Sequence, residues 1–155
     1  MSTTEIGAPA PDFDSASTSG SQQALGDLKG RKLVLYFYPK DNTSGCTLEG
    51  QNFRDLHDEF GAANAVILGV SRESIRSHNN FRGKYDFPFD LLSDPEETLC
   101  NTYGVIKEKS MYGRKYMGIE RSTFLIDENG VLRREWRKVK VKGHADEVLE
   151  AVRSL

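Results

Sequence analysis

Cysteine is scarce in this chain, which has only two, Cys46 and Cys100, among its 155 residues. Two thiols are too few for the disulfide framework of a small secreted protein. The sequence has no Cys-x-x-Cys pair and no cluster of cysteine and histidine at metal-ligand spacing, so it does not indicate a zinc site. Each cysteine is therefore expected to be either a reactive thiol or a buried one.

Long apolar runs are also missing. The longest covers residues 33–38, whereas a helix that spans a bilayer needs roughly 20 residues. We therefore do not expect an integral membrane protein. Residues 1–14 have no basic cluster followed by an apolar stretch, which is the pattern of a secretory signal, and this favours a cytoplasmic location.

Charge of one sign is not in excess. The 21 basic and 23 acidic side chains give a formal net charge of -2, so no global positive field attracts phosphates, and nucleic acid is not an expected partner. With 37% hydrophobic and 28% charged residues the composition is that of an ordinary globular protein. The length fits a single domain spanning residues 1–155.

Short apolar runs predict the strands of an α/β protein. The run at residues 33–38 is aromatic and β-branched, as in a strand buried on both faces, and Pro39 closes it. Asn129 and Gly130 predict the turn of a hairpin. The predicted strands cover residues 33–38, 65–71, 89–93, 121–127 and 131–136, and the polar stretch 15–23 is expected to form a loop or an edge hairpin.

Helical patterns fill the intervals between the predicted strands. They cover residues 46–60, 74–85, 95–103 and 145–154, with Asp94 expected as the N-cap of the third helix and Pro95 at its first position. The resulting order, β-α-β-α-β-α-β-β-α, favours a central mixed β-sheet flanked by helices on both faces. This is the thioredoxin-like arrangement of the α/β class.

The most informative segment is residues 39–46, which leaves a buried strand and enters a helix. In the first turn of that helix, unpaired backbone N–H groups and the helix dipole favour the thiolate form of Cys46. The alternative is that Cys46 is a small buried apolar residue, and position alone does not decide between the two. Thr43, one turn earlier, offers a hydroxyl that can hydrogen-bond a sulfur and a bound oxygen substrate, although it could also be a simple N-cap.

The spacing Pro39-x-x-x-Thr43-x-x-Cys46 resembles the active-site signature of the peroxiredoxins, thiol peroxidases on a thioredoxin-like fold. The wider string FYPKDNTSGCTLEGQNFRD resembles their bacterioferritin comigratory protein, or Q-type, branch. The resemblance continues in GAPAPDF at residues 7–13, in SDPEETLCNTYGV at 93–105 and in ERSTFLIDENG at 120–130, and so covers most of the chain.

The resemblance implies a role for each of four residues. It makes Cys46 the peroxidatic cysteine, Thr43 its hydrogen-bond partner, Pro39 the shield over the thiolate and Arg121 the charged activator. A planar guanidinium can stabilise a thiolate and hydrogen-bond peroxide oxygens. The alternatives from the residues alone are an ordinary surface arginine at Arg121 and a simple strand terminator at Pro39.

Glu49 matches a position that is often acidic in this branch and could hold Arg121, although a solvated charge on the helix is the interpretation that we favour. The three histidines, at positions 57, 78 and 144, receive no role. The aromatic residues Tyr36, Phe37, Tyr38, Phe81 and Phe87 are expected in the core, with Tyr38 or Phe81 as alternative linings of an apolar mouth for an organic peroxide.

The chain departs from the family where a second, resolving cysteine is expected. Many members of this branch carry it five residues after the first, which here is Gln51, and no cysteine occurs in the alternative region, residues 74–85. Only Cys100 remains, and we expect it to be buried. We therefore expect an external thiol to return oxidised Cys46 to its reduced form. The alternative is that Cys100 acts as the resolving thiol.

The sequence thus predicts a thiol peroxidase that reduces hydrogen peroxide and organic hydroperoxides through a sulfenic acid at Cys46, without a cofactor or a metal. Its expected partners are the peroxide and a thiol reductant such as thioredoxin, glutaredoxin or a small thiol, and we expect a monomer. A thiol-disulfide oxidoreductase is a weak rival, because Glu49 stands where a second thiol is needed. A binding or holdase-like module with an inert Cys46 is the rival from another class.

Overall fold

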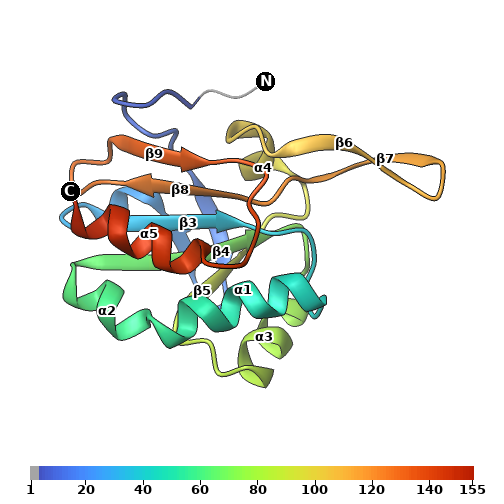
Figure 1. Ribbon diagram of the computed structural model, residues 1–155, viewed down its shortest axis with the longest axis horizontal. Coiled ribbons are helices and arrows are strands. Elements are labelled where there is room, and N and C mark those ends of the chain that lie inside the picture. Colours follow the sequence, from blue (N-terminus) through green and yellow to red (C-terminus); the bar gives the residue numbers. More distant parts are fainter. Residues whose placement is uncertain (1–3) are drawn as a thin grey trace.

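The computed structural model describes residues 4–155, which form a seven-stranded mixed sheet and a separate two-stranded one (Figure 1). The strand order in the large sheet is β2-β1-β5-β4-β3-β8-β9. Central β3 pairs with β4 in parallel and with β8 in antiparallel orientation. The bounds are β1 Asp14–Ser17, β2 Gln22–Ala24, β3 Lys32–Phe37, β4 Ala65–Ser71, β5 Asp90–Ser93, β8 Ser122–Ile126 and β9 Leu132–Trp136.

The central strand is buried on both faces, because successive side chains point to opposite sides of a strand. Val34 and Tyr36 belong to a core cluster that also takes side chains from α1 (Ser44–Asp55), α2 (His57–Ala62), α3 (Ile75–Lys84) and α5 (His144–Arg153). Leu33, Leu35 and Phe37 belong to a second cluster with α4 (Thr98–Thr102), the N-terminal segment and the short 3-10 helix η1 (Leu25–Leu28). The sheet therefore separates two cores. The predicted thioredoxin-like arrangement is confirmed.

Most predicted strands and helices lie within one or two residues of their expected bounds, and the stretch 15–23 is the edge hairpin β1–β2. The predicted helix over residues 46–60 is wrong, because α1 ends at Asp55 and α2 begins at His57. Between them Leu56 (φ -102°, ψ 4°) turns the chain, and Phe53 and Phe60 both reach the core from the two helices. The sequence has neither Gly nor Pro there to signal the break.

The predicted helix over residues 95–103 is also too long, since α4 covers only Thr98–Thr102 and Asp94 is not its N-cap residue. Glu97 is the N-cap residue and has a left-handed φ of 64°. The turn before it is closed by a hydrogen bond from the N–H of Glu97 to the carbonyl of Asp94. The Asp94 carboxylate nevertheless accepts the backbone N–H groups of Leu99 and Cys100 at 3.1 and 2.8 Å. This carboxylate lies outside the helix and accepts hydrogen bonds from first-turn N–H groups that have no partner within the helix.

The sequence did not predict the hairpin of β6 (Ile106–Met111) and β7 (Arg114–Ile119), which extends away from the body of the molecule in Figure 1. Its two-residue turn is Tyr112 and Gly113, which both have positive φ, at 52° and 77°. A tyrosine is an uncommon choice at such a position, where Asn-Gly is the usual signal. The turn residues therefore concealed the hairpin.

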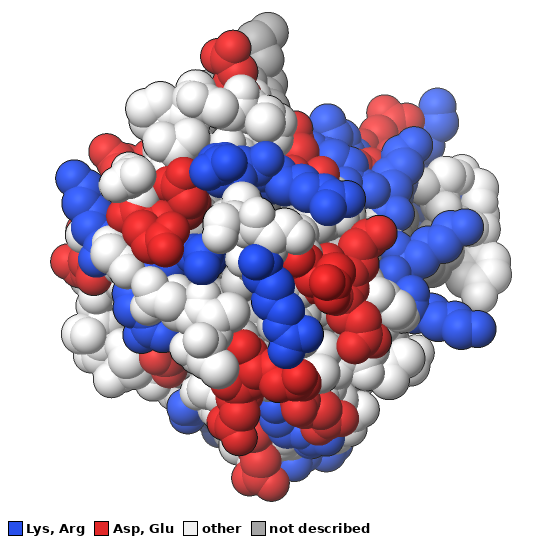
Figure 2. All heavy atoms as spheres, turned by 60° about the vertical axis from the view of Figure 1, so that its left-hand side comes forward, with Lys and Arg blue, Asp and Glu red and all other residues white. Residues whose placement is uncertain are grey.

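Basic and acidic side chains are interspersed over the face shown in Figure 2, in keeping with the small net charge. Among the helices described for residues 4–155, none is both long and apolar enough to cross a membrane.

Gly50 on α1 is required by packing, because a Cβ there would lie 2.3 Å from Cζ of Phe87. We predict that Gly50→Ala destabilises the fold by about 1–3 kcal/mol, although alanine is the better helix former by about 1 kcal/mol. The control is Gly61→Ala on α2, where a Cβ meets nothing within 4 Å, and this variant should be slightly stabilised. Urea unfolding of both variants tests the pair, and equal stability of Gly50→Ala and the parent would contradict it.

Candidate active site

Cys46 lies in the first turn of α1, directly after the loop that follows β3. Thr43 precedes the helix in extended conformation (φ -83°, ψ 154°), and the carbonyl of Thr43 accepts the first helical hydrogen bond, from Thr47 at 2.9 Å. The Cys46 side chain is 2% exposed and belongs to the same core cluster as Phe53, seven residues further along the helix. A buried sulfur thus lies at the positive end of a helix dipole, as the sequence predicted.

Arg121 reaches this sulfur from β8. The pairing of Ser122 with Phe37 places Arg121, the residue before β8, at the end of β3 where the loop to α1 begins. Its Nη2 donates to Cys46 Sγ at 3.4 Å. A Cβ at Gly45 would lie 3.2 Å from the same Nη2, so the absence of a side chain there leaves room for the guanidinium. The sheet register therefore brings together two residues that are 75 positions apart in the chain.

Glu49 is not the solvated helix charge that we favoured, and that prediction is wrong. Its side chain is 1% exposed, and Oε1 accepts a hydrogen bond from Arg121 Nη1 at 2.6 Å. Oε2 is buried as well and has no hydrogen-bond partner among residues 4–155. The guanidinium therefore bridges a carboxylate and a thiol with two different nitrogens, a fixed fork geometry that only arginine provides.

Burial raises the pKa of Glu49 to about 7, even though the positive charge of Arg121 and its hydrogen bond act in the opposite direction. Burial by itself lowers the pKa of Arg121, but the negative charges of Glu49 and Cys46 raise it above its ordinary value. Arg121 thus stays protonated across the physiological range. The ionisation of Glu49 is the variable part of this cluster near neutral pH.

Thr43 and Pro39 lie on the same loop. The Thr43 side chain is exposed, and its hydroxyl donates to the Lys40 carbonyl at 2.8 Å. The expected hydrogen bond between Thr43 and Cys46 is therefore not present among residues 4–155, where Cys46 Sγ is bonded by Arg121. Thr43 occupies the N-cap position without a side-chain capping bond to the described residues. Pro39 is half-buried after β3 and borders a shallow depression next to the ion pair of Arg72 with Glu97, whose atoms are 2.8 Å apart.

A second cation that sequence reasoning missed comes from the hairpin. Lys109 on β6 is half-buried, and its pKa is lowered by burial and by the charge of Arg121, whereas the charge of Cys46 acts to raise it. Arg72, next to β4, donates to the Met117 carbonyl on β7 at 3.3 Å and so contacts this hairpin. No local signal marked Lys109, because the hairpin that carries it was itself not predicted.

The aromatic residues expected in the core are all buried, as predicted, and the alternative of an apolar mouth is not supported. Tyr38 and Phe81 are 0% and 1% exposed and belong to the core cluster under α1 and α3.

Cys100 is buried too, as predicted, with an exposed fraction of 0%. Burial and the hydrogen bond and charge of Asp94 raise the pKa of the Cys100 thiol far above its ordinary range. Cys46 and Cys100 belong to the two different core clusters, on opposite faces of the sheet.

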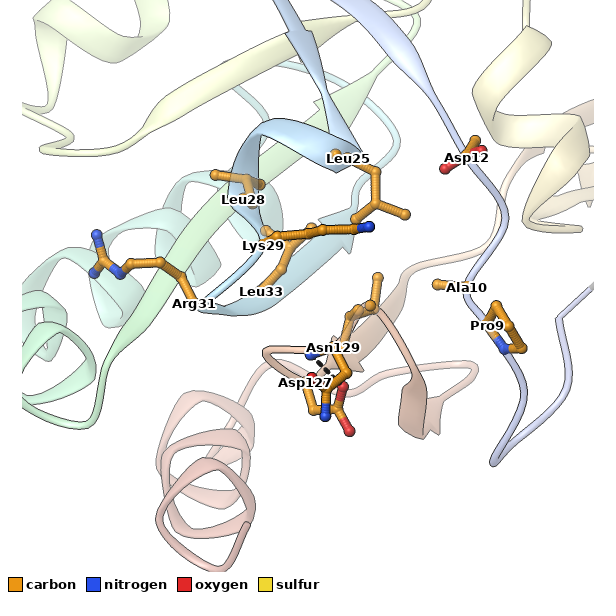
Figure 3. Close-up of a pocket in the computed structure, with 13 residues that line it drawn as sticks. Pro9, Ala10, Asp12, Leu25, Leu28, Lys29, Arg31, Leu33, Asp127 and Asn129 are labelled. Carbon is orange, nitrogen blue, oxygen red and sulfur yellow. Dashed lines mark hydrogen bonds between the residues drawn. The ribbon is translucent and has the colours of Figure 1, made fainter.

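A cavity of about 190 Å³ lies elsewhere, and Figure 3 shows its lining. Leu33 at the start of β3 contributes to it, together with Leu25, Lys29 and the turn that contains Asp127 and Asn129. None of the four predicted site residues lines this cavity. Within residues 4–155, no three His, Cys, Asp or Glu side chains gather in a group that could hold a metal ion.

Comparison with known proteins agrees with this geometry. A model of the AhpC/TSA family matches residues 6–135. Peroxiredoxin Bcp of Bacillus subtilis is 50% identical over 99% of this chain and 98% of its own length. Among solved structures, peroxiredoxin Q of Xanthomonas campestris has a TM-score of 0.87 at 52% identity, covering 92% of this chain and 90% of that one. A mutant PrxQ of Xylella fastidiosa has a TM-score of 0.93 at 43% identity, covering 99% and 98%.

A thioredoxin-like fold that holds a buried thiol against an arginine defines the class of thiol-dependent peroxidases. The chain belongs to the AhpC/TSA family, and within it to the peroxiredoxins of the bacterioferritin comigratory protein, or Q-type, branch. A structure of the Xanthomonas campestris bacterioferritin comigratory protein, 51% identical to this chain, concerns the alkyl peroxide reduction activity of that protein.

The raised pKa of Glu49 predicts a pH dependence. As the pH falls through about 7, Glu49 takes up a proton, and the guanidinium of Arg121 loses the partner that fixes its orientation. Glu49→Gln mimics the protonated form at every pH. The rate constants of the parent and of Glu49→Gln with peroxide should therefore be nearly equal at pH 5.5. At pH 8.5 the parent should be about tenfold faster, because misplacement of a catalytic group can lower the rate by up to about two orders of magnitude.

Stopped-flow rates of the parent, Glu49→Gln and the control Glu120→Gln over this pH range measure the ratio of the parent rate constant to that of each variant. Glu120 precedes Arg121 in the chain, and its side chain makes no hydrogen bond to Cys46 or Arg121 among residues 4–155, so its variant should follow the parent. A ratio for Glu49→Gln that does not change with pH would contradict a role for Glu49 in orienting the guanidinium.

Proposed function

We propose that Cys46 is the peroxidatic thiol of this enzyme and reduces hydrogen peroxide and organic hydroperoxides. The observation that carries the proposal is the position of Cys46 Sγ, buried in a helix first turn and 3.4 Å from a guanidinium nitrogen of Arg121. Helix dipole and guanidinium both favour the thiolate, which is the nucleophilic form. Burial strengthens these electrostatic interactions, because water does not screen them.

The first half-reaction needs one thiolate only. The sulfur attacks the terminal peroxide oxygen, an S–O bond forms and the O–O bond breaks. The departing oxygen takes up a proton and leaves as water or an alcohol, and Cys46 is oxidised to a sulfenic acid. In this scheme Arg121 stabilises the thiolate and the charge that develops on the peroxide. The Thr43 hydroxyl donates to the Lys40 carbonyl, which leaves its oxygen able to accept a hydrogen bond from the incoming substrate. The role of a shield over the sulfur is proposed for Pro39 from the family resemblance, and Pro39 is half-buried on the loop between β3 and α1.

Two observations favour organic hydroperoxides as substrates. The alkyl peroxide reduction reported for the Xanthomonas campestris relative comes from a protein that is 51% identical over 92% of this chain. In addition, Leu48, two residues after Cys46, is a large apolar side chain that is 48% exposed. Such a side chain next to the reactive helix turn offers contact to an alkyl group.

Recycling is proposed to use a thiol from another molecule. The thiol attacks the sulfenic sulfur, an S–S bond forms and water leaves; a second thiol then reduces the mixed disulfide and restores Cys46. Cys100 is a poor resolving thiol, because it lies across the sheet from Cys46 and is fully buried. The reductant is proposed to be thioredoxin, glutaredoxin or a small thiol. A single domain over residues 1–155, a monomer and a cytoplasmic location stay predictions from the sequence.

The two rival functions have less support. A dithiol oxidoreductase would need a second cysteine where Glu49 stands, and Glu49 is instead paired with Arg121. A binding or holdase-like module with an inert Cys46 would not account for a guanidinium directed at the sulfur.

The decisive variant is Cys46→Ser, since serine is nearly isosteric but a far weaker nucleophile at neutral pH. We predict that peroxide consumption in the presence of a thiol reductant falls to the uncatalysed rate while the thermal midpoint changes little. The matched control is Cys100→Ala, which removes the other thiol and should consume peroxide like the parent. Retained turnover in Cys46→Ser would refute the proposal.

The proposed recycling by an external thiol determines which oxidation products form at Cys46. After one equivalent of peroxide, mass spectrometry should show a sulfenic acid at Cys46, trapped with a selective reagent, and no intramolecular disulfide. Excess peroxide should carry Cys46 on to the sulfinic acid, because no second thiol intercepts the intermediate. If the parent instead forms a Cys46–Cys100 disulfide and Cys100→Ala loses turnover, the enzyme uses two cysteines.

A further inference from the structure

A second buried cluster of polar groups lies beside the loop that carries the site, and the peroxide chemistry does not use it. Its centre is Asp41, two residues before Thr43, whose side chain is 2% exposed. Oδ1 accepts the hydroxyl of Tyr38 at 2.7 Å. Oδ2 accepts the hydroxyl of Ser77 at 2.7 Å and faces Nδ1 of His78 at 2.8 Å. Both of these partners come from α3, the helix that follows β4.

The His78 ring is held on both sides. Its side chain is fully buried, and Nε2 lies 2.9 Å from the carbonyl oxygen of Leu92 on β5. A carbonyl only accepts, so Nε2 donates to Leu92, and Nδ1 is the ring nitrogen that faces the Asp41 carboxylate. Burial acts to raise the pKa of Asp41, but the hydrogen bond and charge of His78 outweigh it and the pKa is lowered. Asp41 and His78 therefore form a buried pair in which both ring nitrogens and both carboxylate oxygens have hydrogen-bond partners.

Stability alone is a weak reason for such a pair. Removing a carboxylate and its polar partners from water is costly, and apolar side chains of similar volume are often at least as stabilising. What a fully hydrogen-bonded buried pair does provide is one defined geometry. Here that geometry joins three parts of the chain: the loop at Asp41, α3 at Ser77 and His78, and β5 at Leu92.

The two halves of the catalytic cycle make opposite demands on this loop. Peroxide is small and reacts where Cys46 meets Arg121, in the closed arrangement. A reductant thiol must approach the sulfenic sulfur itself, and a side chain that is 2% exposed gives it no path. The loop and the first turn of α1 must therefore open locally during recycling.

Resting on the proposed function, we propose that the Asp41–His78 pair, with Ser77 and Tyr38, is a latch that holds the active-site loop closed and positions Cys46 against Arg121. Its release exposes the oxidised sulfur to the reductant. Asp41 and His78 touch neither Cys46 nor Arg121 by any hydrogen bond within residues 4–155, so they are positioning residues and not catalytic ones.

Two substitutions at one position separate the two bonds of the ring. The amide nitrogen of asparagine reaches about the place of Nδ1, so His78→Asn keeps a donor to Asp41 and loses the bond to Leu92. The amide nitrogen of glutamine reaches about the place of Nε2, so His78→Gln keeps the bond to Leu92 and loses the one to Asp41. A latch that acts through Asp41 must therefore fail in His78→Gln and be rescued in His78→Asn.

Two readouts are measured on each variant: the second-order rate constant with hydrogen peroxide and the amide hydrogen exchange of the peptide covering residues 39–46. For His78→Gln we expect the rate constant to fall about tenfold and exchange in this peptide to rise about tenfold, because the loop opens more often. Reduction of the preformed sulfenic acid by a small thiol should become faster. His78→Asn should stay within about threefold of the parent on all measures.

A milder pair of variants covers the case in which His78→Gln does not fold. Tyr38→Phe deletes one phenolic hydroxyl bonded to Asp41 at 2.7 Å, and Tyr103→Phe deletes one bonded to the Pro11 carbonyl at the same distance, on the other face of the sheet. Only Tyr38→Phe should raise exchange in residues 39–46 and lower the peroxide rate. Tyr103→Phe should lose stability alone.

These measurements distinguish a latch from a purely structural cluster. If His78→Gln or Tyr38→Phe lowers the thermal midpoint but leaves the peroxide rate and the exchange of residues 39–46 as in the parent, the cluster is only structural and the latch is refuted. If the parent does not consume peroxide, the proposed function fails, and the exchange measurements still test whether the pair holds the loop.

Discussion

The forked contact of Arg121 with Cys46 and Glu49 is the interaction on which the site depends. One guanidinium supplies both contacts, to Sγ at 3.4 Å and to Oε1 at 2.6 Å. Its position follows from the antiparallel register of β8 on β3, which brings the residue before β8 to the start of the loop leading to α1. A shift of that register by one residue would turn the arginine to the opposite face of the sheet. The hydrophobic alternation that fixes the register therefore also fixes the chemistry.

The sheet also separates the two thiols into different surroundings. Cys46 and Cys100 are both almost completely buried, but their surroundings are opposite in charge. Cys46 lies at a helix start beside a cation, whereas Cys100 lies beside the Asp94 carboxylate, which acts against its ionisation. Because the two cysteines belong to cores on different faces, a disulfide between them would require the sheet or α4 to unfold. The proposed assignment of one thiol to peroxide and none to resolution thus has a topological basis.

Local signals in the sequence were sufficient for much of this structure. The strand over residues 65–71 has the bounds expected from its apolar run, and Cys46 lies in a helix first turn as its neighbours indicate. What could not be read locally depends on distant partners. Glu49 looked like a solvated helix charge because Arg121 is 72 residues away. His78 likewise had no cue, since its carboxylate partner stands 37 residues earlier on another element.

Burial of the reactive sulfur has two consequences that oppose each other. In a dry site the charge of Arg121 acts on the thiolate and on the departing oxygen with little screening, which favours peroxide reduction. The same burial shuts out a bulky thiol, so the closed site that is best for oxidation is worst for recycling. A chain with a second cysteine on the same helix could resolve the intermediate internally, but this chain has Gln51 at that position. In the proposed cycle the free-energy cost of opening the loop therefore sets how long the sulfenic acid lasts, and the proposed latch assigns this cost to the groups that hold Asp41, away from the sulfur itself.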